Sequence, residues 1–281
     1  MKPTDFAHVD LQIADGVGLI TLNRPDRRNA WSGGMAVEYR WALHHCHHDP
    51  DVRVVVLAAA GDDFCVGADT GLLAEIDANG GDYQSERADL PPYPEGTPDA
   101  FRHNHLYPLT ISTPLVAAIQ GACAGAGFVL ATYADLRFAE RPGKITTSFA
   151  RLGLPAEYGL GWLLPRLVGL PNAAQLLYCS DVLDADQAAA LGWVQRVFEP
   201  GGVLAGTLSF ARRLARESSG ESLRMMKRQL FVEAVSGLDA AYRRSVDDMN
   251  GALRHPDFRE GLRALRERRP PNFLVPGHEH E

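Results

Sequence analysis

Two short turns rich in glycine and alanine carry the first chemical signal in this sequence. They read "FCVGAD" at residues 64–69 and "GACAGAGF" at residues 121–128, and each lies between a predicted strand and a predicted helix. The first N–H groups of a helix have no partner within the helix and carry the positive end of its dipole. Each turn can therefore direct a backbone N–H at an oxygen atom, and two such turns permit an oxyanion hole with two donors.

The same residues also permit other interpretations. A single turn of this kind is usually only a tight connection between a strand and a helix. Gly121, Gly125 and Gly127 also fit a dinucleotide-binding turn, with Glu140 about 20 residues further on as a ribose-binding acid. The short-chain dehydrogenases that use such a turn also need a Tyr-x-x-x-Lys pair, and none of the eight tyrosines has a lysine four residues later. Dinucleotide binding is therefore the weaker interpretation.

Other catalytic motifs are missing from the sequence. It contains no G-x-S-x-G elbow, no phosphate-binding P-loop and no H-E-x-x-H zinc motif. The run "HHCHHD" places His44 and His48 four residues apart, a spacing that suits a metal ion on a helix. These histidines also end an amphipathic helix, where the helix dipole favours imidazolium without any metal. We predict no metal site.

The elements that must position the two turns can be read from the pattern of apolar residues. "VDLQIADGVGLITLNRP" predicts a hairpin around Asp15 and Gly16, and "RVVVLAA" at 53–59 predicts a buried strand. "GGMAVEYRWALHHC" predicts an amphipathic helix, and residues 80–98 predict a proline-rich loop. "DLRFAE" and "KITTSF" predict short strands, and the chain from Pro155 onward predicts mostly helices. The fold class is therefore α/β.

Length and composition narrow the class of protein. The chain has 281 residues, of which 46% are hydrophobic, enough for one large domain or a domain with a helical appendage. Its net charge of −7 argues against binding to nucleic acid. It has neither an apolar run of about 18 residues nor an apolar signal core in "MKPTDFAHVD", so we predict no membrane span and no secretion. Its four scattered cysteines indicate reduced thiols and hence a cytoplasmic protein.

Five longer segments together resemble the enoyl-CoA hydratase/isomerase (crotonase) superfamily. They read "GLITLNRPDRRNAW", "FCVGADTGLL", "PLVAAIQGACAGAGFVLATYADLRFA", "FARLGLPAEYGLGWLLPRLVG" and "EGLRALRERRPPNF", and the likeness extends from about Val9 to Phe273. The resemblance implies a spiral of ββα units and a helical C-terminal part, assembled as trimers that often pair into hexamers. It also implies an acyl-CoA thioester as the ligand. We accordingly predict a core at residues 1–200 and a C-terminal helical part and tail at residues 201–281.

The resemblance assigns the two turns a role. The family binds the thioester carbonyl between two backbone N–H groups, which by motif belong here to Ala68 and Ala126. Negative charge develops on that oxygen when a proton leaves the α-carbon, and one donor of this kind contributes about 3–4 kcal/mol to the transition state elsewhere. A larger side chain in the turn would block the thioester, so we expect small residues there.

The sequence departs from the family's hydratases at two positions. Those enzymes use two glutamates, and the matching positions here hold Val129 and Phe149. Neither side chain can transfer a proton, so both are predicted to be pocket wall.

One carboxylate remains in a suitable place. In "GLPAEYG", Glu157 matches the position where isomerases of the family carry a single acid–base residue. Its neighbours are apolar or aromatic, and one of them, Trp162, is also predicted to be pocket wall. Burial among these neighbours would raise the pKa of Glu157 toward a range useful for proton transfer. The alternative is that Glu157 caps the helix that is predicted to begin near Gly159.

Candidates for binding coenzyme A cluster in the first third of the chain. The segment "NRPDRRNA" offers Arg24 and Arg28 to the nucleotide phosphates, although Asp26 replaces the lysine that usually follows the proline. The backbones of Val66 and Ala68 are predicted to meet the adenine. Asp69 is a further candidate, and capping of the helix that follows it is the competing role.

Two further candidates lie near the end of the chain. Arg268 and Phe273 fall in the segment that resembles the family's C-terminus, and they would reach a coenzyme A site, either their own or a neighbour's. The competing interpretation is that the arginines of this region only keep a helix face solvated.

These observations predict an acyl-CoA enzyme that moves a carbon–carbon double bond. Glu157 would take an α-proton and return it at the γ-carbon, while Ala68 and Ala126 hold the enolate oxygen. The alternatives are hydration of a 2-enoyl-CoA with a single acid, and a catalytically inactive acyl-CoA-binding relative. No cofactor or metal is predicted, because coenzyme A is part of the substrate. The acyl-CoA thioester and further copies of the chain are the predicted partners, with neither nucleic acid nor membrane.

Overall fold

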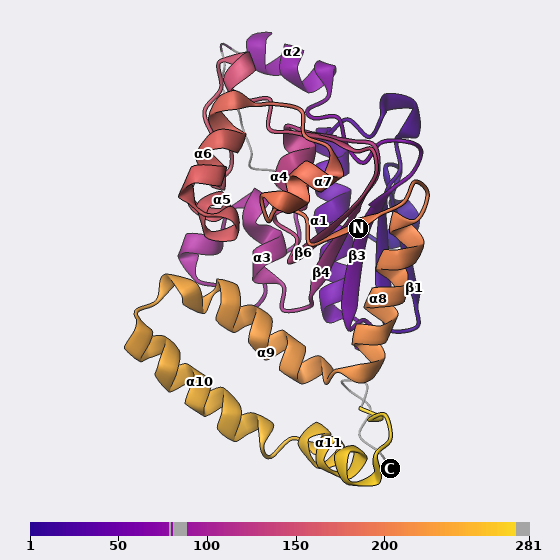
Figure 1. The fold of residues 1–281 in the computed structure, drawn as a ribbon, viewed down its shortest axis with the longest axis vertical. Coiled ribbons are helices and arrows are strands. Elements are labelled where there is room, and N and C mark those ends of the chain that lie inside the picture. Colours follow the sequence, from indigo (N-terminus) through magenta and orange to yellow (C-terminus); the bar gives the residue numbers. More distant parts are fainter. Residues whose placement is uncertain (79, 81–88, 274–281) are drawn as a thin grey trace.

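The computed structural model describes residues 1–78, 80 and 89–273. A six-stranded sheet in the order β1-β2-β3-β4-β6-β8 lies at its centre (Figure 1). The strands are β1 (Val9–Ala14), β2 (Val17–Leu22), β3 (Val54–Ala59), β4 (Leu115–Ile119), β6 (Leu136–Glu140) and β8 (Arg196–Phe198). A separate two-stranded sheet pairs β5 (Ala122–Ala124) with β7 (Lys144–Thr146).

The sheet is antiparallel only at one edge. β1 and β2 form the predicted hairpin, and Asp15 and Gly16 take the positive φ values of 55° and 78° that a tight hairpin turn requires. Each later pair of neighbours is parallel, which brings the carboxyl ends of β2, β3, β4 and β6 to one edge of the sheet. The two turns of interest follow β3 and β4 in the chain, so parallel pairing places them at that same edge.

Helices cover both faces of the sheet. Alternate residues of a strand point to opposite faces. In β3, Val54 and Val56 belong to the cluster that includes α8 (Val203–Glu217), whereas Val55 and Leu57 belong to the cluster that includes α1 (Gly33–His48). Every residue of β3 is buried, as expected of a parallel strand covered on both sides.

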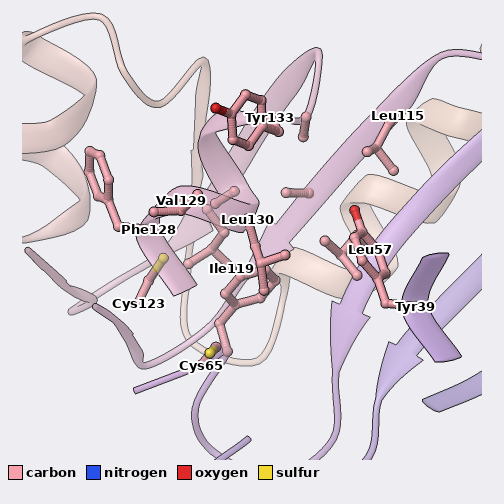
Figure 2. Close-up of a cluster of buried hydrophobic side chains, with 14 of the residues drawn as sticks. Tyr39, Leu57, Cys65, Leu115, Ile119, Cys123, Phe128, Val129, Leu130 and Tyr133 are labelled. Atoms are coloured by element: carbon pink, nitrogen blue, oxygen red, sulfur yellow. The ribbon is translucent and has the colours of Figure 1, made fainter. Parts of the chain in front are cut away.

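Short helices follow the turns and complete the core. They are α2 (Thr70–Ala78), α3 (Tyr107–Thr110), α4 (Ala126–Thr132), α5 (Leu160–Val168), α6 (Leu170–Cys179) and α7 (Ala185–Ala190). α4 lies against the sheet, and Figure 2 shows its side chains in one buried cluster with Tyr39 of α1, Leu57 of β3 and Leu115 of β4. All four cysteines are free. Within the described ranges, no helix is both long and apolar enough to cross a membrane.

The last three helices form a C-terminal arm beyond the sheet. They are α9 (Gly220–Phe231), α10 (Leu238–Ala252) and α11 (Pro256–Glu267), and they run along the lower end of the molecule in Figure 1. α8, which follows the predicted boundary near residue 200, packs on the sheet instead. The arm exposes many large apolar side chains, namely Met226, Leu230, Leu238, Tyr242, Met249, Leu253, Phe258, Leu262 and Leu265. α10 buries none of its residues in the single chain.

A buried lysine fastens the arm to the core. Lys227 of α9 is 4% exposed, and its Nζ lies 3.0 Å from the Thr113 carbonyl and 3.0 Å from Asp135 Oδ2. Burial lowers the pKa of Lys227, and the charge of Asp135 opposes that shift. The contacts of Lys227 therefore join α9 to the residues that come just before β4 and just before β6.

We expect the Lys227→Met substitution to lower the free energy of unfolding by about 3 kcal/mol. Removing one partner of a buried ion pair leaves the other charge, here Asp135, without compensation. Urea denaturation at one fixed protein concentration measures the change. The control is Lys144→Met, which removes an exposed lysine and should shift the free energy by less than about 0.5 kcal/mol. Equal effects of the two substitutions would contradict this role for Lys227.

Candidate active site

The two glycine- and alanine-rich turns lie in direct contact. Cys65 and Cys123 pair as a parallel bridge, in which the Cys65 N–H donates to the Ala122 carbonyl and the Ala124 N–H donates to the Cys65 carbonyl, both at 3.0 Å. A β-carbon on Gly125 would lie 3.6 Å from the α-carbon of Gly67. Segments about 60 residues apart in sequence thus form one wall.

Each turn presents a backbone N–H that is free to bind a ligand. Ala126 is the first residue of α4, so its N–H has no partner within the helix. Ala68 lies just before α2, between Gly67, whose carbonyl accepts from the Trp31 N–H, and Asp69, whose N–H donates to the Trp31 carbonyl. Neither the Ala68 nor the Ala126 N–H has a hydrogen-bond partner among the described residues. This arrangement can place two donors on one oxygen.

The glycines of the second turn are needed for packing between the turns. A β-carbon on Gly121 would lie 2.0 Å from the Asp62 carbonyl oxygen, and one on Gly127 would lie 2.3 Å from the Cys65 carbonyl oxygen. Both distances are far below van der Waals contact, so only glycine fits. Space for a thioester was the expected reason for small residues, but at these two positions the close approach of the first turn already requires them.

Asp69 holds the first turn in place. Its Oδ1 accepts from the Gly71 N–H at 2.9 Å, which caps α2, and its Oδ2 lies 2.9 Å from Arg24 Nη2. The hydrogen bond from Gly71 and the charge of Arg24 lower the pKa of Asp69 below its ordinary value. Capping, the competing role, is therefore present. Arg24 also donates to the Ala30 carbonyl, so the pair supports the turn from within the protein.

An apolar pocket opens beside the second turn. One wall is the face of α4 that carries Ala126, Val129, Leu130 and Tyr133, which lie one helical turn apart. The opposite wall belongs to α1 and to the segment before it. The lining residues of these and the remaining walls are Trp31, Ser32, Gly33, Ala36, Val37, Tyr39, Arg40, Leu43, Leu72, Leu90, Asn104, His105, Tyr107, Pro108 and Tyr158. Val129 is pocket wall, as predicted.

The turn that carries Glu157 borders this pocket. Tyr158 lines it, and the Tyr158 carbonyl accepts a hydrogen bond from the Tyr133 hydroxyl of α4. Tyr158 and Gly159 have φ values of 49° and 83°. A left-handed conformation is costly for a residue as large as tyrosine, and such residues cluster at functional sites. This turn is therefore held in a special conformation at the pocket wall.

Glu157 itself is half-buried and free to act. α5 begins at Leu160 with Gly159 as its N-cap and no capping side chain, so the capping alternative for Glu157 is wrong. Its carboxylate has no hydrogen-bond or ion-pair partner among the described residues. Burial raises its pKa above the ordinary value of a glutamate. Such a carboxylate can accept a proton more readily than an exposed one.

Two predicted wall residues lie away from this pocket. Phe149 is 3% exposed and packs in the main core, three residues after the end of β7. Trp162 lines a separate cavity between α5, the segment around Phe101, and Val235 of the arm. Its ring stacks under the Arg166 guanidinium at 3.8 Å. Both residues were predicted to be pocket wall, but neither lines this pocket.

The predicted coenzyme A residues fall into two groups. Arg28 is exposed and lies beside the first turn, with its Nε 2.6 Å from Asp63 Oδ2 and its carbonyl accepting from the Val66 N–H at 3.4 Å. Arg268 and Phe273 lie at the end of α11, and the Phe273 carbonyl accepts from Arg53 at 2.9 Å. Arg24, Arg28, Val66 and Asp69 thus surround the first turn, whereas Arg268 and Phe273 do not join them in one chain.

The weaker interpretations of the sequence can be compared with the structure. Glu140 accepts from the Gly201 N–H at 3.0 Å at the end of β6, where it joins the β6 end to the turn before α8. His44 Nδ1 lies 3.1 Å from the Tyr107 hydroxyl, and His48 Nδ1 lies 2.8 Å from the His44 carbonyl. Burial is the largest cause that lowers the pKa of His44, to about 4. These contacts account for Glu140 and for both histidines within the fold.

Sequence reasoning missed two pocket residues, His105 and Arg40. The His105 ring stacks on Tyr158 with centroids 3.7 Å apart, and burial lowers its pKa to about 4, so it is neutral at physiological pH. Arg40 follows Tyr39 on α1 and lines the pocket from the other side. Arg40 contacts Tyr93 and His105 contacts Tyr158, and each contact joins residues more than 50 positions apart in the chain. Local sequence patterns do not predict contacts of this kind.

Comparisons with known proteins agree with this geometry. A model of the enoyl-CoA hydratase/isomerase family matches residues 12–275. The chain is similar to the 1,2-epoxyphenylacetyl-CoA isomerase of Escherichia coli strain K12, with 29% identity over 266 residues that cover 93% of this chain and 96% of that protein. It is also similar to the crotonyl-CoA hydratase of Syntrophomonas wolfei, with 27% identity over 273 residues that cover 96% and 98% of the two chains.

The fold is shared with solved structures as well. The crystal structure of a probable enoyl-CoA hydratase/isomerase from Mycobacterium abscessus matches with a TM-score of 0.82 at 29% identity, covering 95% of this chain and 98% of that chain. The chain therefore belongs to the enoyl-CoA hydratase/isomerase family, and its fold is the crotonase fold. Members of this family are enzymes that process acyl-CoA thioesters.

Proposed function

We propose that this enzyme moves a carbon–carbon double bond within an enoyl-CoA, from the 3-position to the 2-position. The carbonyl oxygen of the thioester binds between the N–H groups of Ala68 and Ala126. The Glu157 carboxylate takes a proton from the α-carbon, and the electron pair of the broken C–H bond moves into a dienolate whose oxygen the two N–H groups stabilise. Glu157 then returns the proton at the γ-carbon. Protons and electrons balance without an added reactant.

The observation that carries this proposal is a pair of N–H groups, both without a partner among the described residues, on touching turns, one of which lines an apolar pocket. Preorganised donors in a site that excludes water stabilise developing oxyanion charge without reorganisation. Val129 and the rest of the α4 face supply an apolar wall for the acyl chain. No cofactor or metal enters the proposed reaction, because the thioester and the hole provide the electrophile.

The choice of isomerisation over hydration is supported by the residue types at the two positions where hydratases of the family carry glutamates. Hydration needs groups that position water and protonate the α-carbon, and the two positions expected to carry them hold Val129 and Phe149. A proton shift needs only one base that reaches both carbons, and the pKa of Glu157 is raised for that role. Hydration is the second candidate, because one of the similar proteins is a crotonyl-CoA hydratase.

We expect 3-enoyl-CoA isomerisation to be at least about 10-fold faster than hydration of the matching 2-enoyl-CoA. The physical reason is that the proposed mechanism has a single acid–base residue, Glu157, and each missing acid–base group typically costs about 10²-fold or more. Both reactions are measured on the same preparation with chains of equal length, by loss or gain of conjugated thioester absorbance. Hydration that outruns isomerisation would refute the assignment and favour the second candidate.

The coenzyme A part of the substrate is proposed to lie over the first turn. Arg28 is exposed there and can meet a phosphate, and the backbone carbonyls of Val66 and Ala68, which accept from no described residue, are available to the adenine. Arg268 and Phe273 are proposed to reach a coenzyme A site only between copies of the chain, since they lie on the arm. We also propose a cytoplasmic location, on the basis of the four free cysteines.

We expect the protein to be a trimer or a dimer of trimers in solution. The arm leaves α10 without a buried residue and exposes large apolar side chains, which a partner surface would cover. Light scattering at micromolar concentration measures the mass. The double substitution Leu230→Glu with Leu238→Glu should dissociate the assembly, whereas Ile13→Glu on the edge strand β1 should not. A wild-type monomer would contradict the prediction.

A further inference from the structure

Two apolar cavities share one residue, Tyr133, in their walls. The first is the acyl pocket beside Ala126. The second cavity is the one that Trp162 lines, together with Phe101, Leu163 and others, and none of its lining residues carries a charge. The proposed reaction makes no use of the second cavity, so its relation to the acyl pocket calls for an explanation.

Two other segments of the chain also lie between the cavities. His105 lines the acyl pocket, and the next residue, Leu106, lines the second cavity. In the same way Tyr158 lines the acyl pocket and Gly159 lines the second cavity. Consecutive α-carbons are only about 3.8 Å apart, so the layer that separates the two cavities is thin. Tyr133 completes this layer from the side of α4.

The Tyr133 side chain reaches from the end of α4 to the turn at residues 158–159. Its hydroxyl donates a hydrogen bond to the Tyr158 carbonyl. A β-carbon on Gly159 would lie 3.2 Å from the same hydroxyl oxygen. Tyr133 is also 1% exposed, and a close-packed side chain that is bonded at its far end has little freedom to move. Tyr133 is therefore a fixed part of the layer between the cavities.

The position of Tyr133 suits contact with the end of an acyl chain. The thioester is proposed to bind at Ala126, the first residue of α4, and Tyr133 directly follows the last residue of that helix. Seven residues of α-helix rise about 10 Å. Val129 and Leu130 line the pocket between these two ends. An acyl chain that is held at Ala126 and follows this face of α4 therefore meets Tyr133 at its far end.

We propose that the Tyr133 ring sets the maximum length of the acyl chain by closing the acyl pocket against the second cavity. This inference rests on the proposed function, because it takes the pocket beside Ala126 as the acyl site. Each further methylene that is buried in an apolar cavity strengthens binding by about 3- to 4-fold. That gain should stop where the chain reaches the ring, since forcing extra atoms into a packed wall is unfavourable.

The test measures binding by calorimetry, so that it does not depend on the reaction catalysed. The ligands are butanoyl-, hexanoyl-, octanoyl-, decanoyl- and dodecanoyl-CoA. Wild-type affinity should rise with chain length and then stop rising at one member of the series. In Tyr133→Leu, which removes the ring, the affinity should continue to rise for at least one further member. At that length the variant should bind about 10-fold more tightly than the wild type, the gain for two buried methylenes.

Three further variants separate the ring from other effects. Tyr133→Phe removes the hydroxyl but keeps the ring, so the limiting chain length should not change. Tyr133→Met, whose flexible side chain adapts to irregular gaps, repeats the test if Tyr133→Leu does not fold. Tyr178→Leu makes the matched change at a tyrosine that is 78% exposed on α6, and it should leave the whole series as in the wild type.

Trp162 gives a direct signal of where the longer chain binds. It lines the second cavity and is not among the residues that line the acyl pocket. Dodecanoyl-CoA should therefore change the tryptophan fluorescence of Tyr133→Leu more than that of the wild type. The additional change should disappear when Trp162→Phe is combined with Tyr133→Leu. A gain in affinity without this signal would contradict entry into the second cavity.

The outcomes distinguish this inference from the proposed function. Wild-type affinity that rises through dodecanoyl-CoA would overturn the inference, and so would a limit in Tyr133→Leu equal to that of the wild type. A shift in Tyr133→Phe as large as in Tyr133→Leu would also overturn it, because the ring would then not set the limit. In each case acyl-CoA binding, and with it the proposed function, would stand. Failure of every ester to bind would instead overturn the proposed function and the inference that rests on it.

Discussion

Turnover in 3-enoyl-CoA isomerisation is expected to fall by about 10²- to 10⁴-fold when Glu157 is replaced by glutamine. This is the usual contribution of a general acid–base group, and glutamine keeps the shape of the side chain while it removes proton transfer. The structure strengthens the expectation in two ways. The carboxylate of Glu157 has no capping role at α5, and it has no partner among the described residues. A fall in activity would therefore report the missing proton transfer and not a disturbed helix.

The pH dependence of kcat/KM gives a second test of the role of Glu157. Burial raises the pKa of Glu157, and a base must be deprotonated to work. The value of kcat/KM should therefore be constant at high pH and fall as the pH drops through this raised pKa. In Glu157→Gln this acidic limb should disappear from the residual activity. Affinity for a saturated acyl-CoA should change little in the variant, because the hole that binds the thioester is made of backbone.

Two controls protect this interpretation. Glu157→Asp keeps the carboxylate but shortens the side chain, so part of the activity should remain. Glu199→Gln removes an exposed carboxylate that pairs with Arg141 far from the pocket, and it should leave turnover unchanged. An undiminished rate in Glu157→Gln would show that another group moves the proton. The hole and the fold would then stand without the single-base mechanism.

A proline at position 126 is expected to lower turnover by about 10²- to 10³-fold, the effect of removing one oxyanion donor. Ala126 is the first residue of α4, a position that tolerates proline because its N–H is not used by the helix. The substitution therefore deletes the proposed donor and should leave the protein folded and assembled. Affinity for the ground-state thioester should fall much less than turnover, since the hole acts most strongly on the developing charge.

The matched control at the same position is Ala126→Gly. Glycine keeps the N–H and removes only a methyl group, so activity should stay within about 3-fold of the wild type. Circular dichroism and light scattering should give the same fold and mass for all three proteins. A proline variant as active as the glycine variant would mean that the Ala126 N–H is not a catalytic donor.

The sequence alone determined the elements and the family. Alternating apolar residues on either side of Asp15 and Gly16 predicted the hairpin, and the continuous apolar run at 53–59 predicted the buried strand β3. The five family-like segments predicted the crotonase fold, which the comparisons confirm. These features can be predicted locally, because the spacing of apolar residues in strands and helices, and the residue types that form turns, depend on residues close together in the sequence. Glu157 was also identified as a candidate base from a short segment of the sequence.

Only the tertiary structure decided how the site is assembled. Gly121 and Gly127 are glycines because the backbone of the other turn lies against them, a contact between segments about 60 residues apart. Val129 lines the pocket, whereas Phe149 packs in the main core and Trp162 lines another cavity, because contacts between distant segments decide where each side chain lies. Arg40 lines the pocket where residues 91–104 pack on α1, a contact between segments about 50 residues apart that the local sequence does not show. Burial and unsatisfied donors are properties of long-range packing, and for that reason the local sequence could not supply them.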